Sequence, residues 1–260
     1  MATDMTMNVL SRALAAAALL VVAAPTFAEG HALPYSFKSG TGNQASLQRG
    51  ARDFMSYCSG CHSLKYLRYN RLGKDLGIPE DLLKANLMFT SDKLGDHIVS
   101  AMPGPSKDAG TQSESEKWFG KAPPDLSLSA RERGPDWIYS YLMSFYVDPS
   151  RPTGVNNLVL PNASMPHVLG NLQGYQALEK KEGGSEEHEG HKPPFVLVQK
   201  GLLSPEEYKE FVGDLTNFLV YAAEPGRNRR MAIGGFVLAF IVVLWILSYL
   251  LKVEYWKDVH

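Results

Sequence analysis

The sequence predicts a mainly α-helical fold with large loop inserts and one membrane-spanning helix near the C-terminus. Two segments carry apolar residues at helical spacing, and an aromatic-rich segment between them has a helical pattern as well. The third observation is an uncharged run of twenty residues close to the end of the chain. Stretches rich in Pro, Gly and Asn separate these segments, and they predict loops rather than further regular structure.

Three helices are expected in the first two thirds of the chain. The clearest begins near Ser46 and runs into Cys58, with apolar residues at positions 47, 51, 54 and 55. Residues 79–100 carry a weaker helical pattern, and a helix dense in aromatic residues is expected over 135–147. The Pro-rich segments between them, and the chain over 148–174, are expected to be irregular.

A fourth helix is predicted at Ser204, where three signals for a helix start agree. Ser204 is a capping residue, Pro205 follows at the first helical position, and Glu207 stands three residues after the cap. The charged, low-complexity stretch at 179–194 comes before this helix. Its composition cannot bury apolar surface, which predicts a solvated or disordered loop.

Both ends of the chain have the composition of segments that meet a membrane. Residues 1–28 combine an apolar run with a turn-former and small residues, which predicts a signal peptide. Residues 231–251 include the uncharged run, which as a helix is about 30 Å long and matches the hydrocarbon thickness of a bilayer. We therefore expect one soluble domain over 29–226 and a short tail over 252–260. The net charge of −1 gives no indication of nucleic-acid binding.

The only two cysteines, Cys58 and Cys61, form a C-x-x-C-H sequence with His62. This is the attachment signature of a c-type haem. On one helical turn, both thiols can reach vinyl groups on the same porphyrin edge, and the adjacent imidazole can reach the iron. A thioredoxin-type pair would need a surrounding βαβ pattern, and a zinc site would need a second cysteine pair. The sequence has neither, so we predict one covalently bound haem c with His62 as an iron ligand.

The residues alone leave the second axial ligand open. Met102 and Met165 each precede a proline in a loop that can present a thioether to the iron. Met165 is slightly favoured because the chain has then had length to wrap around the haem. His97 and His167 are the histidine alternatives, and Met88 is a weaker candidate in a helical stretch.

Taken together, these residues resemble the cytochrome c1 family, the haem subunit of the bacterial-type quinol–cytochrome c reductase (cytochrome bc1) complex. The resemblance covers most of the sequence after the predicted signal peptide. It rests on SLQRG leading into CSGCHSL, on WFG, on APPDLS, on Met165-Pro166, on the helix ending in Glu224-Pro225, and on the tail YWKDV.

The resemblance implies roles for four further residues. Met165 would be the second axial ligand, Arg131 would lie near a haem propionate, and Pro123 and Pro124 would line the haem pocket. In a c-type cytochrome, a Met ligand raises the reduction potential above that of two histidines.

The resemblance also implies electron transfer, with no substrate chemistry by this chain on its own. One electron would come from a Rieske iron–sulfur protein and pass to a soluble or membrane cytochrome c, with cytochrome b as a further partner in the bilayer. Two alternatives stay open. One is another membrane-anchored monohaem cytochrome c, such as an oxidase subunit or a shuttle, and the other is a haem-based ligand sensor.

Two sequence signals disagree about orientation. Three arginines at 227, 229 and 230 precede the apolar run, whereas only Lys252 and Lys257 follow it. The positive-inside rule alone would place the haem domain in the cytoplasm, but it has little weight for a long domain that is already being exported. We therefore expect an inner-membrane protein with its haem domain in the periplasm, its C-terminus in the cytoplasm, and aromatic anchors at positions 255 and 256.

Overall fold

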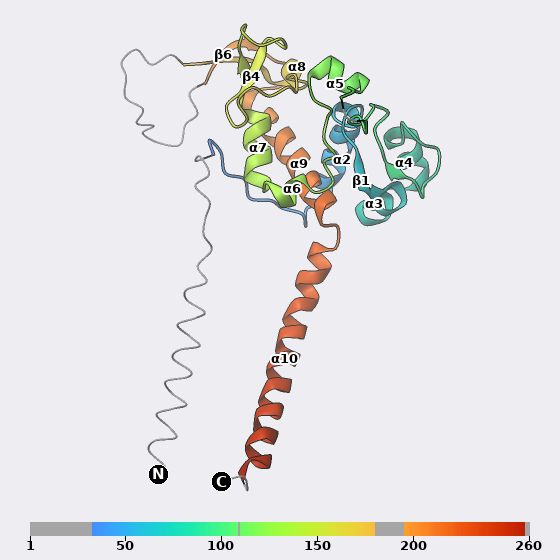
Figure 1. Ribbon diagram of the computed structural model, residues 1–260, viewed down its shortest axis with the longest axis vertical. Helices are drawn as coiled ribbons and strands as arrows, with labels where there is room; N and C mark the ends of the chain where they lie inside the picture. Colours follow the sequence, from blue (N-terminus) through green and yellow to red (C-terminus); the bar gives the residue numbers. More distant parts are fainter. Residues whose placement is uncertain (1–32, 109, 180–194, 258–260) are drawn as a thin grey trace. The chain divides into compact units, whose positions relative to one another are not determined.

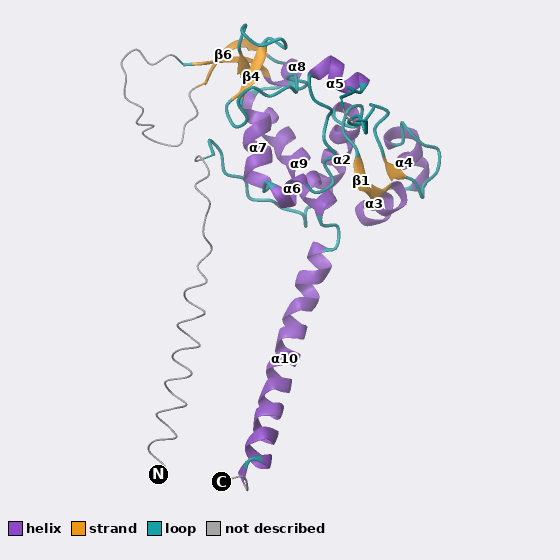
Figure 2. Ribbon diagram, viewed as in Figure 1, coloured by secondary structure: helices purple, strands orange, loops and turns teal. Residues whose placement is uncertain are grey.

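The computed structural model describes residues 33–108, 110–179 and 195–257, which are mainly helical (Figures 1 and 2). The predicted fold class is confirmed. The helices are α2 (Gln44–Tyr57), α3 (Tyr69–Leu76), α4 (Glu80–Leu87), α5 (Glu114–Phe119), α6 (Ser129–Glu132), α7 (Pro135–Met143), α8 (Gly170–Gln173), α9 (Pro205–Ala223) and α10 (Arg227–Tyr255). The strands pair antiparallel in twos: β1 (Leu64–Arg68) with β2 (His97–Ile98), β3 (Phe145–Val147) with β4 (Val155–Asn157), and β5 (Gly174–Leu178) with β6 (Phe195–Lys200).

Helix α2 is the helix predicted to run into the cysteine motif. Its start is fixed by Asn43, whose side-chain oxygen accepts the backbone N–H of Ser46 at 3.2 Å. Ala51 and Phe54 on its apolar face are fully buried. At its end, the N–H of Cys58 still donates to the carbonyl of Phe54 at 2.8 Å, so the first cysteine of the motif stands directly on the helix terminus.

Helix α9 begins where the three sequence signals placed it. Ser204 and Glu207 form a complete capping box, in which each side chain bonds to the backbone N–H of the other residue. The apolar stripe of α9 is buried in the main core, including Tyr208, Val212 and Phe218. Helix α9 packs against both α2 and α7, so it holds the haem-motif helix in the centre of the domain (Figure 1).

The backbones of α2 and α9 approach each other closely at Gly50. A Cβ atom placed on Gly50 would lie 2.1 Å from the carbonyl oxygen of Asp214 and 2.7 Å from the Cβ of Phe218. Only a residue without a side chain fits between these helices.

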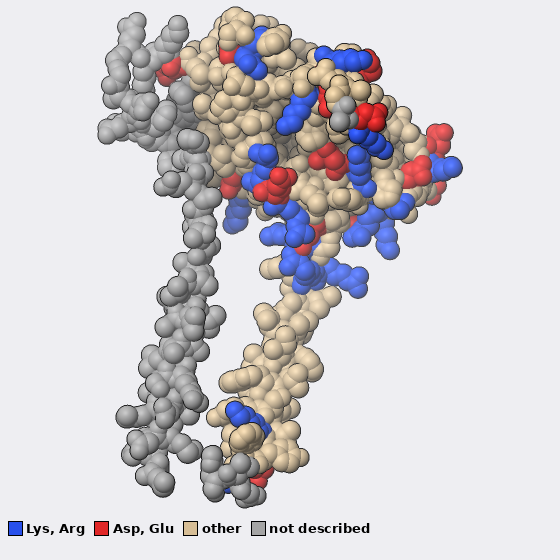
Figure 3. Space-filling model, in the orientation of Figure 1, with Lys and Arg blue, Asp and Glu red and all other residues tan. Residues whose placement is uncertain are grey.

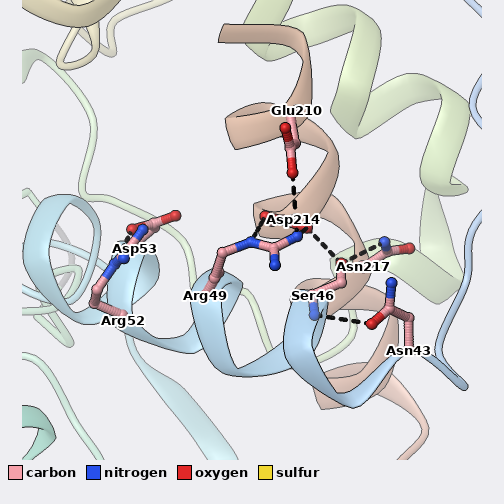
Figure 4. A network of polar contacts seen from close by, with 8 residues as sticks. All are labelled: Asn43, Ser46, Arg49, Arg52, Asp53, Glu210, Asp214 and Asn217. Carbon is pink, nitrogen blue, oxygen red and sulfur yellow. Dashed lines mark hydrogen bonds and ion pairs between the residues drawn. The ribbon is translucent and has the colours of Figure 1, made fainter. Parts of the chain in front are cut away.

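A polar network beside Gly50 joins the same two helices (Figure 4). The side chain of Asp214 is only 7% exposed, and it accepts hydrogen bonds from Arg49 Nε at 2.5 Å and Arg49 Nη2 at 3.0 Å. Ser46 Oγ donates to the same carboxylate at 2.5 Å, while Asn217 Nδ2 donates to Ser46 Oγ at 2.9 Å. Arg49 also reaches Glu210 at 3.3 Å. Because a buried carboxylate is costly unless its acceptors are used, this network fixes how α2 lies along α9.

Two of the expected helices end earlier than predicted. The stretch 79–100 contains one helix, α4, and then strand β2. After α4 the side chain of Ser91 bonds to Asp96 and to the backbone of Lys93, which competes with helix formation. The helix expected to reach Val147 ends at Met143, and Phe145–Val147 pair instead with β4. Aromatic and β-branched residues favour a strand where a partner strand is available.

Several short elements have no counterpart in the prediction. Strand β1, helix α3 and the β5–β6 pair were not expected, and the largely irregular chain over 148–174 contains β4 and α8. The charged stretch expected to form a loop lies outside the described residues except for Glu179, and so does the predicted signal peptide.

Helix α10 contains the predicted apolar run. It has 29 residues, and its length and composition suffice to cross a membrane, a property that no other helix in the described parts of the chain shares. None of its side chains is buried against the rest of the chain. An apolar helix exposed along its whole length is stable only in an apolar environment, which is consistent with a membrane anchor.

Candidate haem site

The C-x-x-C-H residues form one hydrogen-bonded turn at the end of α2. The backbone N–H groups of Cys61 and His62 both donate to the carbonyl of Cys58, at 3.1 and 2.8 Å. The turn is tied back to the helix by Ser59, whose hydroxyl donates to the carbonyl of Met55 at 2.7 Å. The two thiols and the imidazole are therefore held within a single turn, as attachment along one porphyrin edge requires.

The imidazole of His62 is oriented by a main-chain carbonyl. His62 Nδ1 lies 2.8 Å from the carbonyl oxygen of Pro124, so Nδ1 carries the proton and donates it. In this tautomer Nε2 has a free lone pair for a metal. Burial lowers the pKa of His62, although the Pro124 bond opposes part of this effect, and the ring stays neutral at physiological pH. The residues present therefore fit a haem iron.

The segment that carries Pro124 is fastened to the chain that follows the motif. The N–H of Leu126 donates to the carbonyl of Ser63 at 2.9 Å, and the N–H of Lys65 donates to Asp125 Oδ2 at 3.0 Å. Ser127 completes the connection by accepting from the N–H of Tyr66 at 3.2 Å. The polar residues of APPDLS thus position the carbonyl that orients the histidine.

This role of Pro124 was not visible in the sequence. The resemblance marked Pro123 and Pro124 as pocket-lining residues, but it gave no part to the Pro124 carbonyl. A proline has no N–H, and the chain before it is extended, so a Pro-Pro pair does predict carbonyls that are free of helical bonding.

A cavity of about 480 Å³ lies beside the cysteine turn. Its wall includes Cys61, Pro123, Pro124 and Met102. The structure thus brings the two prolines and one of the two methionine candidates to the same cavity as Cys61.

The pKa values of the two cysteine thiols are shifted in the opposite direction from those of a redox-active pair. Burial raises the pKa of Cys58 to about 12, and it also raises the pKa of Cys61. Both groups are therefore protonated thiols near neutral pH, whereas disulfide-exchange enzymes lower the pKa of the attacking cysteine. These raised pKa values are the opposite of what a thioredoxin-type pair needs.

The other candidate residues lie apart from this turn. Met165 is half-buried in the loop before α8, and no hydrogen bond within the described chain joins that loop to the Cys58–His62 turn. Arg131 is exposed on the short helix α6. The contacts therefore leave the choice between Met165 and Met102 as open as the residues did.

The two alternative histidines are packed into the protein. The ring of His167 stacks on Phe145 with centroids 4.9 Å apart, and burial lowers the pKa of His167 to about 4. Its Nε2 is buried without a hydrogen-bond partner among the described residues, and the same holds for Nδ1 of His97 in β2. The ring of His167 also hydrogen-bonds to the Gln173 side chain and the Gly174 backbone, so it is held by the surrounding chain.

A C-x-x-C-H turn at a helix end, with its histidine aimed by a backbone carbonyl, defines the class of c-type cytochromes. Comparison with known proteins gives the family. The chain matches the Cytochrome C1 family over residues 35–175 and 203–259. The chain therefore belongs to the cytochrome c1 family, whose members carry a c-type haem and serve electron transport.

Two of three similar curated relatives carry the name cytochrome c1. Cytochrome c1 of Allochromatium vinosum is 54% identical over 222 residues, which cover 84% of this chain and 86% of that protein. The ammonia monooxygenase gamma subunit of Nitrosomonas europaea is 43% identical over 218 residues, covering 84% and 85%. Cytochrome c1 of Rhodospirillum rubrum is 29% identical over 252 residues, covering 88% of each.

Among solved structures, a chain of a hyperthermophilic respiratory Complex III is 16% identical and has a TM-score of 0.45. The alignment covers 98% of this chain and all of that one.

Proposed function

We propose that this chain is the haem-bearing subunit of a bacterial quinol–cytochrome c reductase. It takes one electron from a Rieske iron–sulfur protein, which is thereby oxidised, and it reduces a soluble or membrane cytochrome c by one electron. The observation that carries the proposal is the His62–Pro124 hydrogen bond of 2.8 Å within a chain of the cytochrome c1 family. Cytochrome b and the lipid bilayer are the remaining partners.

A haem held here would supply a one-electron redox centre, and the chain makes or breaks no substrate bond. The thiols of Cys58 and Cys61 would hold this haem through thioether bonds, because addition of each S–H across a vinyl group would form a C–S bond and a C–H bond without an oxidant. His62 presents Nε2 because Pro124 holds its other nitrogen. We assign Arg131, Pro123 and Pro124 to the surroundings of the haem.

We assign the second axial position to Met165. Support comes from the family resemblance, whereas the cavity beside Cys61 is lined by Met102. Replacing Met165 with Leu should leave the haem covalently attached, abolish low-spin six-coordination and lower the reduction potential, since the thioether stabilises the reduced iron. Met102→Leu is the matched control. A normal potential in M165L together with a collapsed potential in M102L would reverse the assignment.

The function is tested by purifying the membrane complex in detergent and recording its redox difference spectrum with identification of each subunit. We expect co-purification with a b-type cytochrome and quinol-dependent reduction of cytochrome c. Isolation as a lone haem protein would favour another anchored cytochrome c, and carbon monoxide binding to the reduced protein would favour a ligand sensor.

Covalent attachment has its own test. The double variant C58S/C61S should show no haem stain after denaturing electrophoresis, since both thioether bonds are lost. Full-intensity staining of this variant would refute the attachment assignment.

We further propose that residues 1–28 are a signal peptide and that α10 anchors the domain in the inner membrane, with the haem domain in the periplasm. Support comes from the length and apolar composition of α10 and from the need for haem attachment outside the cytoplasm. A reporter fused after His260 should be active only if it functions in the cytoplasm. Alkaline phosphatase activity from that position would reverse the topology.

A further inference from the structure

The proposed electron-transfer function gives no part to the arginines at the start of α10. Arg227, Arg229 and Arg230 form the first turn of α10, and all three are exposed. In the proposed topology they lie on the periplasmic side, where the positive-inside rule gives no reason for them. Figure 3 shows Lys and Arg side chains gathered where the globular part is followed by α10.

Only one of the three arginines is neutralised. Arg230 Nη2 lies 2.5 Å from Glu224 Oε1, and Arg230 Nε donates to the same oxygen at 2.8 Å. Within the part of the chain that the structure describes, Arg227 and Arg229 have no carboxylate within 4.0 Å. Two guanidinium groups are therefore available, each with a planar set of donors that matches a phosphate.

The contacts of Asn228 show how these two side chains are directed. Asn228 Nδ2 donates to the backbone carbonyl of Thr41 at 3.1 Å, and Thr41 Oγ1 lies 3.1 Å from Asn228 Oδ1. Asn228 therefore turns toward the domain. Because successive residues of an α-helix are about 100° apart, Arg227 and Arg229 project to either side of that contact.

The position of Arg227 and Arg229 along the chain indicates that their binding partner is a lipid headgroup. The uncharged run begins at Ala232, less than one helical turn after Arg229, so these guanidinium groups lie at the depth of the lipid headgroups. No Trp or Tyr occurs between Glu224 and Gly235, whereas Tyr255 and Trp256 stand at the opposite end of α10. At the start of α10, arginines therefore stand where aromatic residues often contact the membrane interface.

From this geometry we infer that Arg227 and Arg229 bind the phosphates of anionic phospholipid headgroups in the periplasmic leaflet, one on each side of the Asn228 contact. The inference rests on the proposed role of α10 as a membrane anchor. Each arginine near an anionic surface contributes about fivefold to affinity, so the pair contributes about 25-fold. Rising salt weakens this binding, since the site is exposed to solvent.

The test uses the full-length haem-loaded chain in detergent, titrated with phosphatidylglycerol or with phosphatidylcholine of the same acyl chains. Bound lipid is counted by native mass spectrometry. R227Q/R229Q should bind phosphatidylglycerol about 25-fold more weakly than the unaltered chain. Its affinity for phosphatidylcholine should not change. R227K/R229K should bind phosphatidylglycerol more tightly than R227Q/R229Q but more weakly than the unaltered chain, because lysine keeps the charge and lacks the planar set of donors.

K93Q/K200Q is the matched control, because it removes the same charge from two exposed lysines elsewhere on the domain. It should bind phosphatidylglycerol as the unaltered chain does. An equal loss in this control, or unchanged affinity in R227Q/R229Q, would overturn the inference. So would dissociation of R227Q/R229Q from its membrane complex at unchanged lipid affinity, which would identify a protein partner instead.

The haem spectrum is recorded on the same preparations, and quinol-dependent cytochrome c reduction is recorded on membrane complexes that contain each variant. They should be the same in all variants, so a fault in the proposed electron-transfer function appears in the unaltered chain as well. Release of the unaltered chain from membranes by alkaline extraction would refute the anchor itself, and with it the lipid site.

Discussion

Replacing Gly50 with Ala probes the closest contact between the haem-motif helix and the rest of the domain. The added methyl group would lie 2.1 Å from the Asp214 carbonyl oxygen, which is backbone and cannot rotate away. Relief requires α2 and α9 to separate by more than about 1 Å, and such overpacking costs about 3 kcal/mol. Ala is favoured over Gly inside a helix by about 1 kcal/mol. The net loss in free energy of unfolding is therefore about 2 kcal/mol.

This loss should lower the melting temperature by roughly 4–8 °C for a domain of this size, measured by circular dichroism of the haem-loaded protein. G95A is the control, because a Cβ on Gly95 meets no atom within 4 Å. Its stability should stay near that of the unaltered chain. A G50A protein as stable as G95A would show that the two helices can move apart freely, and the argument for close packing would be wrong.

Three further predictions use urea titration of the same protein. Asp214→Ala should lower the free energy of unfolding by about 2 kcal/mol, because it removes the charged hydrogen bonds of a buried carboxylate. The loss is no larger because its partner Arg49 is 40% exposed and therefore partly screened by solvent. An unchanged free energy of unfolding would show that the network is only a surface contact. Ser204→Ala should cost about 1 kcal/mol through loss of the capping box, with the exposed Ser150→Ala as control. Burial raises the pKa of Asp53 above 3.8 despite its pairing with Arg52, so the folded state holds the proton more tightly and the cost of the charge is present at neutral pH and lost in acid. Asp53→Asn should therefore raise stability at neutral pH and lose that advantage as the pH falls below both pKa values, and a constant difference across pH would contradict this reasoning.

The parts of the fold that the sequence predicted well are those with local causes. Helix α9 was expected at Ser204 because its capping box lies within four residues of sequence. The run into Cys58 and the apolar span of α10 likewise depend on the periodicity and composition of their own residues. Elements that need a distant partner were missed. Strand β1 pairs with β2 about thirty residues later, and β3 exists because β4 is available to it.

The candidate site shows the same division. The predicted attachment residues could be recognised because the C-x-x-C-H spacing is specific, and Cys58, Cys61 and His62 do lie on one turn. Their attachment to haem stays a prediction. The orientation of His62 could not be predicted, since it depends on a carbonyl 62 residues away. The second axial ligand stays a prediction for the same reason, because a loop's approach to the opposite haem face leaves no pattern in the sequence.

The hydrogen bond between His62 and Pro124 has a consequence for how the protein tolerates change. The acceptor is the main-chain carbonyl of Pro124, so replacing the Pro124 side chain does not remove this acceptor. What can be altered is the fastening of its segment through Asp125 and Ser127. A change at either residue should therefore act indirectly, because it loosens the loop that carries Pro124 and lets the His62 imidazole rotate. Variants at these two residues would form a graded series in histidine alignment, with the ligand itself left chemically intact.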